Sequence, residues 1–167
     1  MWNLQQLQEC LQMMSPDLKF EEGFGAYQDV FTQTTFDLFL KRLHLKFNEN
    51  AEGLFLKWIA FMEKSKVPYE HFFFDWRGGN IRKDQAFKGP RQNFYGHESF
   101  KPVLDELQNF ETIDNSPLTE PYFQGSEPVH LYIEEIERIW EKIDKEDDWS
   151  AFEQKQNDFK NLKKILG

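Results

Sequence analysis

Residues 51–64 read AEGLFLKWIAFMEK, and this stretch decides the fold class. A helix built from it carries apolar side chains on nearly every side, with Trp58 near its middle. Such a helix is typical of a buried element, because each of its faces must pack against a neighbour. We therefore expect it to be the central and most buried element, surrounded by other helices.

Outward from this stretch, apolar residues recur at helical spacing and predict six further helices. The expected helices cover residues 2–14, the stretch from after Gly25 to 45, and residues 51–64, 69–76, 100–110, 133–143 and 150–166. Residues 80–96 and 112–128 lack a period and are rich in turn-forming residues, so two long irregular connections are expected there. No segment alternates with period two. The prediction is all-α, a single compact domain of about seven helices over residues 1–167.

The composition of the chain indicates which kinds of partner and which cellular compartment to expect. Aromatic residues make up 17% of the chain, including 18 Phe, enough to supply a helical core. A net charge of -9 argues against affinity for nucleic acid or an anionic membrane. The N-terminal residues show no targeting segment, and the expected location is cytoplasmic. The single cysteine, Cys10, cannot form an internal disulfide and is expected to pack as a small apolar residue in a reducing compartment.

Motifs for self-sufficient catalysis are not recognisable. One cysteine and four scattered histidines do not give the spacing of a zinc site, so no metal or cofactor is expected in this chain. Gly23-Phe24-Gly25 resembles a phosphate-binding loop only superficially, and a flexible start to the second helix is the stronger interpretation. The acidic residues 144–148 lack the ligand spacing of a calcium loop and are expected to form a solvated turn.

A local group of basic residues follows the fourth expected helix. It comprises Arg77, Arg82, Lys83, Lys88 and Arg91, followed by the aromatic residues Phe94 and Tyr95. One interpretation is a contact for an anion or for an acidic partner protein. The other is that the basic side chains are ordinary solvated groups and that the aromatic rings pack on the domain's own core.

His71 lies among aromatic residues and has two interpretations. It could be poised as an acid-base group, or it could be partly buried and hydrogen-bonded to the backbone. The second is the commoner arrangement of a histidine in such surroundings.

Four stretches of the sequence, taken in order, resemble segments of a known protein family. Residues 2–7 read WNLQQL, residues 39–45 read FLKRLHL, residues 72–79 read FFFDWRGG, and a last stretch runs from Glu127-Pro128 to Trp140 and Asp147-Asp148-Trp149. In this order they resemble the C-terminal part of the selenoprotein O family, in its proteobacterial branch. Members of that family are pseudokinase-fold enzymes that transfer AMP from ATP to protein hydroxyls. Glycine is usual in the family where this chain has His44.

The resemblance implies a helical scaffold without the catalytic core. The family's nucleotide-binding lysine, its glutamates and its metal-binding Asp and Asn belong to a kinase-like core upstream of this region. ATP and magnesium are therefore expected at that core and not at this chain, which is not expected to be catalytic on its own. The redox-active cysteine or selenocysteine near the C-terminus of many members has no counterpart in residues 163–167.

Three hypotheses follow for the function. The first is a C-terminal scaffold that supports a kinase-like catalytic lobe, which would then be the protein partner. The second is a stand-alone helical module for protein–protein interaction. The third is a small enzyme or ligand-binding protein with a pocket between helices. Neither nucleic acid nor a membrane is expected as a partner in any of them.

Overall fold

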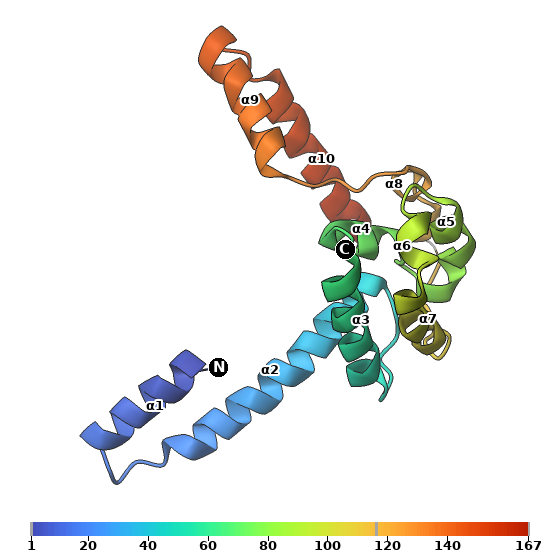
Figure 1. Ribbon diagram of the computed structural model, residues 1–167. Coiled ribbons are helices and arrows are strands. Elements are labelled where there is room, and N and C mark those ends of the chain that lie inside the picture. The colour runs from blue at the N-terminus through green and yellow to red at the C-terminus, as the bar shows by residue number, and fades with distance from the viewer. Residues whose placement is uncertain (1, 116, 167) are drawn as a thin grey trace.

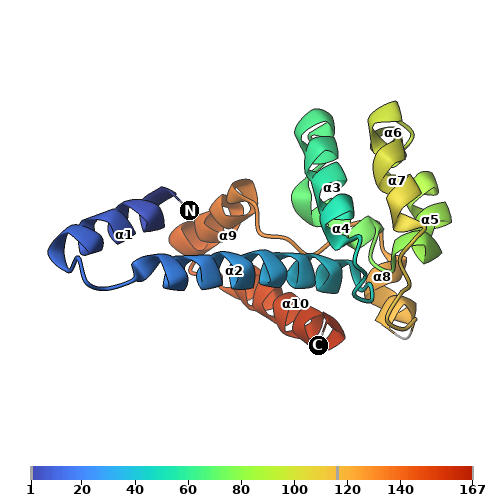
Figure 2. The same ribbon diagram turned by 90° about the horizontal axis from the view of Figure 1, so that it is seen from below.

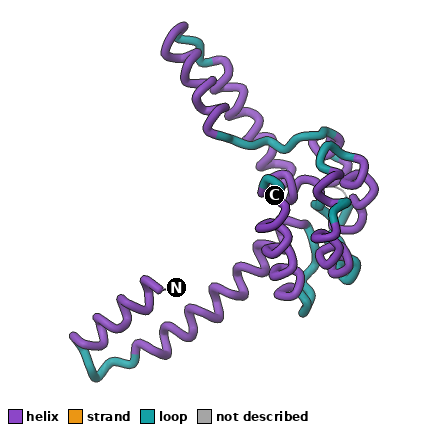
Figure 3. Tube along the Cα trace, viewed as in Figure 1, coloured by secondary structure: helices purple, strands orange, loops and turns teal. Residues whose placement is uncertain are grey.

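The chain is helical, as the sequence predicts. The computed structural model describes residues 2–115 and 117–166, and these contain no β-strand (Figure 3). An isolated antiparallel bridge pairs Leu45 with Thr112. The α-helices are α1 (Trp2–Met14), α2 (Phe20–Leu43), α3 (Ala51–Ser65), α4 (Tyr69–Asp75), α5 (Lys83–Lys88), α6 (Gln92–Tyr95), α7 (Lys101–Leu107), α8 (Pro121–Gln124), α9 (Ile133–Glu146) and α10 (Ser150–Leu166). Three short 3-10 helices join them: η1 (Gly79–Arg82), η2 (Glu98–Phe100) and η3 (Pro117–Thr119).

The described part of the chain has ten α-helices, where about seven were expected. The additional helices are α5, α6 and α8, which lie in the connections 80–96 and 112–128. Each has only four to six residues, too few for a helical period to become visible in the sequence. The prediction of irregular structure was wrong at these three places, and the all-α class is confirmed.

Helix α2 differs from its prediction at its start. It begins at Phe20 and includes Gly23 and Gly25, so these glycines lie inside the helix and not in a flexible loop before it. At the other end, His44 has a left-handed backbone conformation with φ of 58°. This is the position at a helix C-terminus that glycine favours, which gives a physical reason for the glycine usual in the resembled family.

The core lies on one face of α3. Leu54, Trp58 and Phe61 are buried there, whereas Leu56 and Ile59 on the same helix are exposed. Burial is therefore confirmed for one face, and the expectation of burial on all sides was wrong, because α2 and α7 pack against α3 and leave its remaining side open. Other large core residues come from the end of α2 and from residues 72–110, among them Phe39, Leu40, Leu43, Phe72, Phe73, Trp76, Tyr95, Phe100, Val103, Leu107 and Phe110.

Two antiparallel helix pairs project from the core (Figure 1, Figure 2). We call α1 with the first half of α2 the N-terminal arm, and α9 with α10 the C-terminal arm. None of the described residues of α1, α9 or α10 is buried. Cys10 is exposed on α1, so the expectation that it packs as a small apolar residue was wrong. More than half of the surface is exposed at Leu7, Val30, Phe31, Ile133 and Trp140.

No described helix combines the length and the apolar character that crossing a membrane requires.

A tight turn after α4 fixes the direction of the following chain. Gly78 and Gly79 both have positive φ, 90° and 59°. The positive φ of Gly78 disfavours any side chain there, and a Cβ atom would also lie 2.5 Å from a methyl carbon of Leu118, which would have to move. The amide of Gly78 donates to the carbonyl of Leu43 at 2.7 Å, and the hydroxyl of Thr112 donates to the carbonyl of Gly78 at 2.8 Å. The two glycines thus end α4, as predicted, and join it to α2.

Candidate functional site

Helix α4 supplies the polar side chains around which the candidate site is built. Residues 71–75 are all buried, and among them His71 and Asp75 are four positions apart, on the same face of the helix. Helix α6 provides a second such pair, because Arg91 directly precedes it and Tyr95 is its last residue. Both pairs are held by aromatic packing in the core, where Tyr95 contacts Phe61, Trp76 and Phe100.

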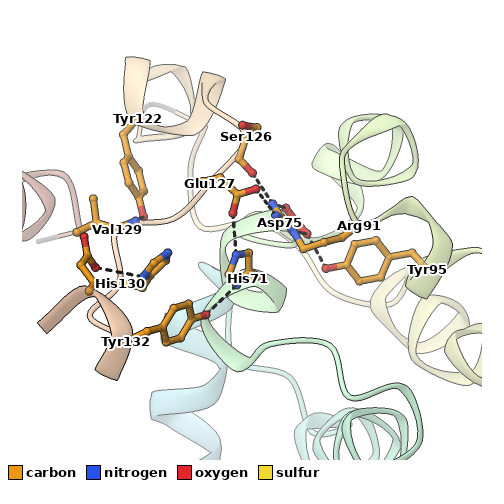
Figure 4. A network of polar contacts seen from close by, with 11 residues as sticks. His71, Asp75, Arg91, Tyr95, Tyr122, Ser126, Glu127, Val129, His130 and Tyr132 are labelled. Atoms are coloured by element: carbon orange, nitrogen blue, oxygen red, sulfur yellow. Dashed lines mark hydrogen bonds and ion pairs between the residues drawn. The ribbon is translucent and has the colours of Figure 1, made fainter. Parts of the chain in front are cut away.

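Asp75 and Arg91 form a buried, two-pronged ion pair (Figure 4). The Arg91 Nε and Nη2 atoms donate to the two Asp75 oxygens at 2.7 and 2.8 Å, and the hydroxyl of Tyr95 donates to Asp75 at 2.6 Å. Burial alone would lower the pKa of Arg91, but the hydrogen bonds and charge of Asp75 raise it. Burial and the neighbouring Asp75 charge raise the pKa of Tyr95. Arg91 is therefore cationic and Tyr95 neutral at any physiological pH.

The segment from residue 126 to residue 132 closes over this pair. Arg91 donates to the carbonyl of Ser126 at 2.6 Å and to the carboxylate of Glu127 at 3.0 Å. Glu127 also contacts the Nε2 atom of His71 at 2.7 Å, and Tyr132 contacts its Nδ1 atom at 3.2 Å. Burial would raise the pKa of Glu127, but His71 and Arg91 outweigh it and lower that pKa. His71 is thus fixed by two side chains, not by the backbone as expected.

The same segment joins the C-terminal arm to the core. The ring of His130 stacks on Tyr132, with centroids 4.0 Å apart. Lys155 on α10 pairs with Glu135 on α9 at 2.5 Å and donates to the carbonyl of His130 at 3.2 Å. A series of hydrogen bonds and ion pairs, continued by the ring stack of Tyr132 on His130, therefore runs from Asp75 in the core to α10. We call this set the Asp75–Arg91 network.

A pocket of about 350 Å³ lies where α4, α8 and the C-terminal end of α10 meet. Its polar lining comes from Arg42, Glu70, Arg77 and Tyr122. Arg42 pairs with Glu70 at 2.7 Å, and Arg77 donates to the carbonyl of Arg42 at 3.0 Å. Burial is the main cause that lowers the pKa of Arg77, and the nearby charge of Arg42 adds to it. We call this the Arg77 pocket.

Arg82 has a structural environment of its own. Its guanidinium lies over the rings of Phe74 and Phe123, 5.3 and 5.2 Å from their centroids. It also donates to the carbonyl of Phe123 at 3.0 Å, as does Gln85. Arg82 therefore holds α8 against α4.

The basic group expected at residues 77–91 is not a surface patch. Arg77, Arg82, Arg91 and Tyr95 are at most 7% exposed, each with contacts inside the domain, and Phe94 packs against the core. These five residues are not an exposed surface for a partner, because loop aromatics and arginine stems fill the space beside α4. Lys88 is exposed and Lys83 is half-buried. Of the two interpretations for the aromatic rings, packing on the domain's own core is the one the structure shows.

Asp75, Glu127 and Tyr132 were not identified as site residues from the sequence. Asp75 was visible only as part of an aromatic stretch, and Glu127 only as the start of a resembling stretch. A signal for Asp75 existed, because an acidic residue flanked by apolar ones on a short helix requires a cationic partner when buried. The sequence did not show which of the downstream arginines, Arg77, Arg82 or Arg91, is that partner.

Of residues 144–148, which were expected to form a turn, only Asp147 and Asp148 lie between α9 and α10, and residues 144–146 belong to the last turn of α9. Asp147 has a left-handed conformation at the end of α9, and Asp148 accepts a hydrogen bond from the amide of Ser150 at 2.9 Å. Among the described residues, no cluster of three or more His, Cys, Asp or Glu side chains is arranged to hold a metal ion.

The sequence model of the family described as protein adenylyltransferase SelO matches residues 1–160. The chain belongs to the SelO family. The resemblance to this family drawn from residues 2–149 is thereby confirmed. The Asp75–Arg91 network lies within the matching region, and so do the residues that line the Arg77 pocket, except Leu162 and Leu166. No curated protein and no solved structure matches the chain significantly.

Proposed function

We propose that the chain is the C-terminal helical scaffold of a SelO-type protein adenylyltransferase and supports a kinase-like catalytic lobe. The observation that carries this proposal is the SelO match over residues 1–160. In this proposal AMP transfer from ATP belongs to the lobe, and the present chain contributes a docking surface and rigidity. The partner is then a protein, in keeping with the chain's negative charge.

The exposed apolar residues of the two arms support a docking role. Val30 and Phe31 on α2 and Ile133 and Trp140 on α9 are each more than half exposed. Large apolar side chains grouped on one surface favour protein association, because burying them removes apolar area from water. Tryptophan at such a position is a frequent source of binding free energy.

The C-terminal arm offers the better-defined surface. A cavity of about 330 Å³ between α9 and α10 is lined almost entirely by apolar side chains, among them Ile136, Trp140, Ile143, Trp149 and Phe152. The opposite face of α9 carries the charged residues, so the helix is strongly amphipathic. An amphipathic helix pair of this kind can receive an apolar element of the catalytic lobe.

The test is reconstitution with a kinase-like core from a SelO-family protein of the same genome. Mixed with this chain, the core is expected to elute as a heterodimer on size-exclusion chromatography and to transfer more labelled AMP to protein than the core alone. Trp140→Glu should weaken the heterodimer at least tenfold, because it places a charge in the apolar face. Lys142→Glu is the matched control, since it introduces the same residue two positions away on the opposite face of α9.

The outcomes separate the candidate functions. Absence of a complex with the parent chain contradicts the scaffold proposal and favours the stand-alone interaction module. A complex that Trp140→Glu leaves unchanged keeps the scaffold and removes the C-terminal arm as its docking surface. Circular dichroism of both variants confirms that each retains its helices before binding is compared.

A further inference from the structure

The Arg77 pocket contains a buried positive charge without a counter-ion. Arg77 is 7% exposed, and no carboxylate among the described residues forms an ion pair with it. Its single hydrogen bond goes to the carbonyl of Arg42, and its Nε atom has no partner in the described part of the chain. Buried charges are normally paired, because a buried charge without a partner destabilises the folded protein by several kcal/mol. Such a charge in a pocket wall indicates that an anion completes the site.

The balance of charge around the pocket indicates what anion fits. Arg42 and Arg77 carry two positive charges, and Glu70 carries one negative charge that pairs with Arg42. The difference is one positive charge, centred on Arg77. A monoanion neutralises it, whereas a dianion such as a phosphate monoester would add a charge facing Glu70.

Tyr122 provides a second polar contact for the same anion. Its hydroxyl oxygen accepts the amide hydrogen of Val129 at 3.2 Å, and no described residue accepts its own proton. Burial raises the pKa of Tyr122, so the hydroxyl stays protonated and can donate at neutral pH. A guanidinium and a phenol that both donate into one pocket match the two oxygens of a carboxylate.

The other walls of the pocket are apolar. They come from Phe73 and Phe74 on α4, Phe123 on α8, and Leu162 and Leu166 on α10. A volume of about 350 Å³ is at the lower end of the range for small-molecule sites. The ligand therefore needs a compact apolar body, and flat rings suit walls made of phenylalanine.

We propose that the Arg77 pocket binds a small monocarboxylate with an aromatic or branched apolar body. The carboxylate pairs with Arg77 and accepts from Tyr122, and the body lies between α4, α8 and α10. Since α10 belongs to the C-terminal arm, the bound acid contacts both the core and the arm. Occupancy then stabilises the position of the arm by adding contacts that exist only when the arm is in place.

The probe for the test is 3-phenylpropanoate, compared with its neutral amide and with phenyl phosphate, by calorimetry on the full chain. The acid is expected to bind saturably, at least tenfold more tightly than either comparison compound, because the charged hydrogen bonds require a monoanion. Equal binding of the amide overturns the role of charge. Tighter binding of phenyl phosphate overturns the monoanion assignment, and absence of acid binding overturns the site.

Three variants test the residues. Arg77→Met should reduce acid affinity at least tenfold, whereas Lys88→Met, an exposed basic residue outside the pocket, should not change it. Glu70→Gln should increase acid affinity severalfold, because it removes the competing carboxylate from Arg42. The side chain of Glu70 is 43% exposed at the edge of the Arg77 pocket, so Glu70→Gln is expected to fold. This variant therefore still tests the proposal if Arg77→Met does not fold. Unchanged or weaker binding by Glu70→Gln contradicts the proposed balance of charge.

Discussion

Asp75 and Arg91 face each other in the interior with two hydrogen bonds of 2.7 and 2.8 Å, although they are sixteen positions apart in the chain. Both side chains are less than a tenth exposed. Arg91 uses its remaining donors on Ser126 and Glu127, so this single residue joins α4, the start of α6 and the segment before α9. The position of Arg91 therefore depends on Asp75.

Replacing Asp75 with Ala should lower the free energy of unfolding by about 3–5 kcal/mol, because the buried Arg91 loses its two-pronged partner and keeps only the half-exposed Glu127 as a counter-ion. Chemical denaturation followed by circular dichroism measures this. The double variant Asp75→Leu with Arg91→Met removes both charges and should recover most of the loss. A single variant as stable as the parent would show that water or another group compensates Arg91.

Trp58→Ala should lower the free energy of unfolding by about 3–5 kcal/mol through lost apolar burial and a cavity. Trp58 is 5% exposed and contacts the rings of Phe39, Phe55 and Phe73. Leu56→Ala is the matched control on the same helix. Its side chain is 59% exposed, and the change should stay within about 0.5 kcal/mol. Equal losses in the two variants would contradict the assignment of the buried face of α3.

His44 should make the stability depend on pH. Burial, and then the charge of Arg77, lower its pKa below the ordinary value of 6.5. The unfolded chain therefore binds a proton at His44 more readily than the folded protein, and stability falls as the pH drops below 6.5 towards the lowered pKa. His44→Asn keeps a residue that tolerates the left-handed conformation and removes the titration. As the pH is lowered from about 8 to about 5, the free energy of unfolding of the variant should increase relative to that of the parent. A difference between the two proteins that stays constant with pH would refute the assignment to His44.

Charge reversal of the basic residues after α4 should have a small effect on stability at the lysines and a large effect at the buried Arg82. Lys83→Glu with Lys88→Glu should change the free energy of unfolding by no more than about 0.5 kcal/mol, as for surface positions in general. Arg82→Glu should prevent folding, because it places a carboxylate against the rings of Phe74 and Phe123. Thermal unfolding distinguishes them. A folded Arg82→Glu protein would mean that this side chain is free in solution.

The chain on its own should not bind ATP with magnesium in the micromolar range. A triphosphate site needs a phosphate cradle and magnesium ligands in fixed register, and the sequence contains no recognisable set of these. Calorimetry with ATP and magnesium tests the expectation. Saturable binding would assign nucleotide chemistry to this chain itself, and competition with 3-phenylpropanoate would then show whether the Arg77 pocket is involved.

The long helices could be predicted from the sequence because their apolar spacing persists over several turns. Helices α3, α9 and α10 have such spacing, and each was located within a few residues of its true ends. The exposed side of α3 could not be predicted. Its apolar residues cover all faces, and which of them meets a neighbour depends on where α2 and α7 lie.

The candidate site was less accessible to sequence reasoning. The basic residues after α4 were recognised as a group, but their burial depends on partners as distant as Glu127, 36 positions beyond Arg91. No local pattern records such a pairing, because it is created by the tight turn at Gly78 and Gly79 and by the return of the chain after α8. The three arginines of this group therefore have three different environments. Arg91 forms a buried ion pair, Arg82 lies over two phenylalanine rings, and Arg77 lines a pocket.

The two arms have a consequence for motion within the folded protein. Helices α1, α9 and α10 contain no buried residue among those described, so their amide hydrogens are protected by helical hydrogen bonds alone. Such segments open at a lower free energy than a core does. Their amides should exchange with solvent through local opening, while those of α3 and α4 exchange only when the whole domain unfolds. The domain therefore has two tiers of stability, and the less stable tier carries the exposed side chains of Trp2 and Trp140.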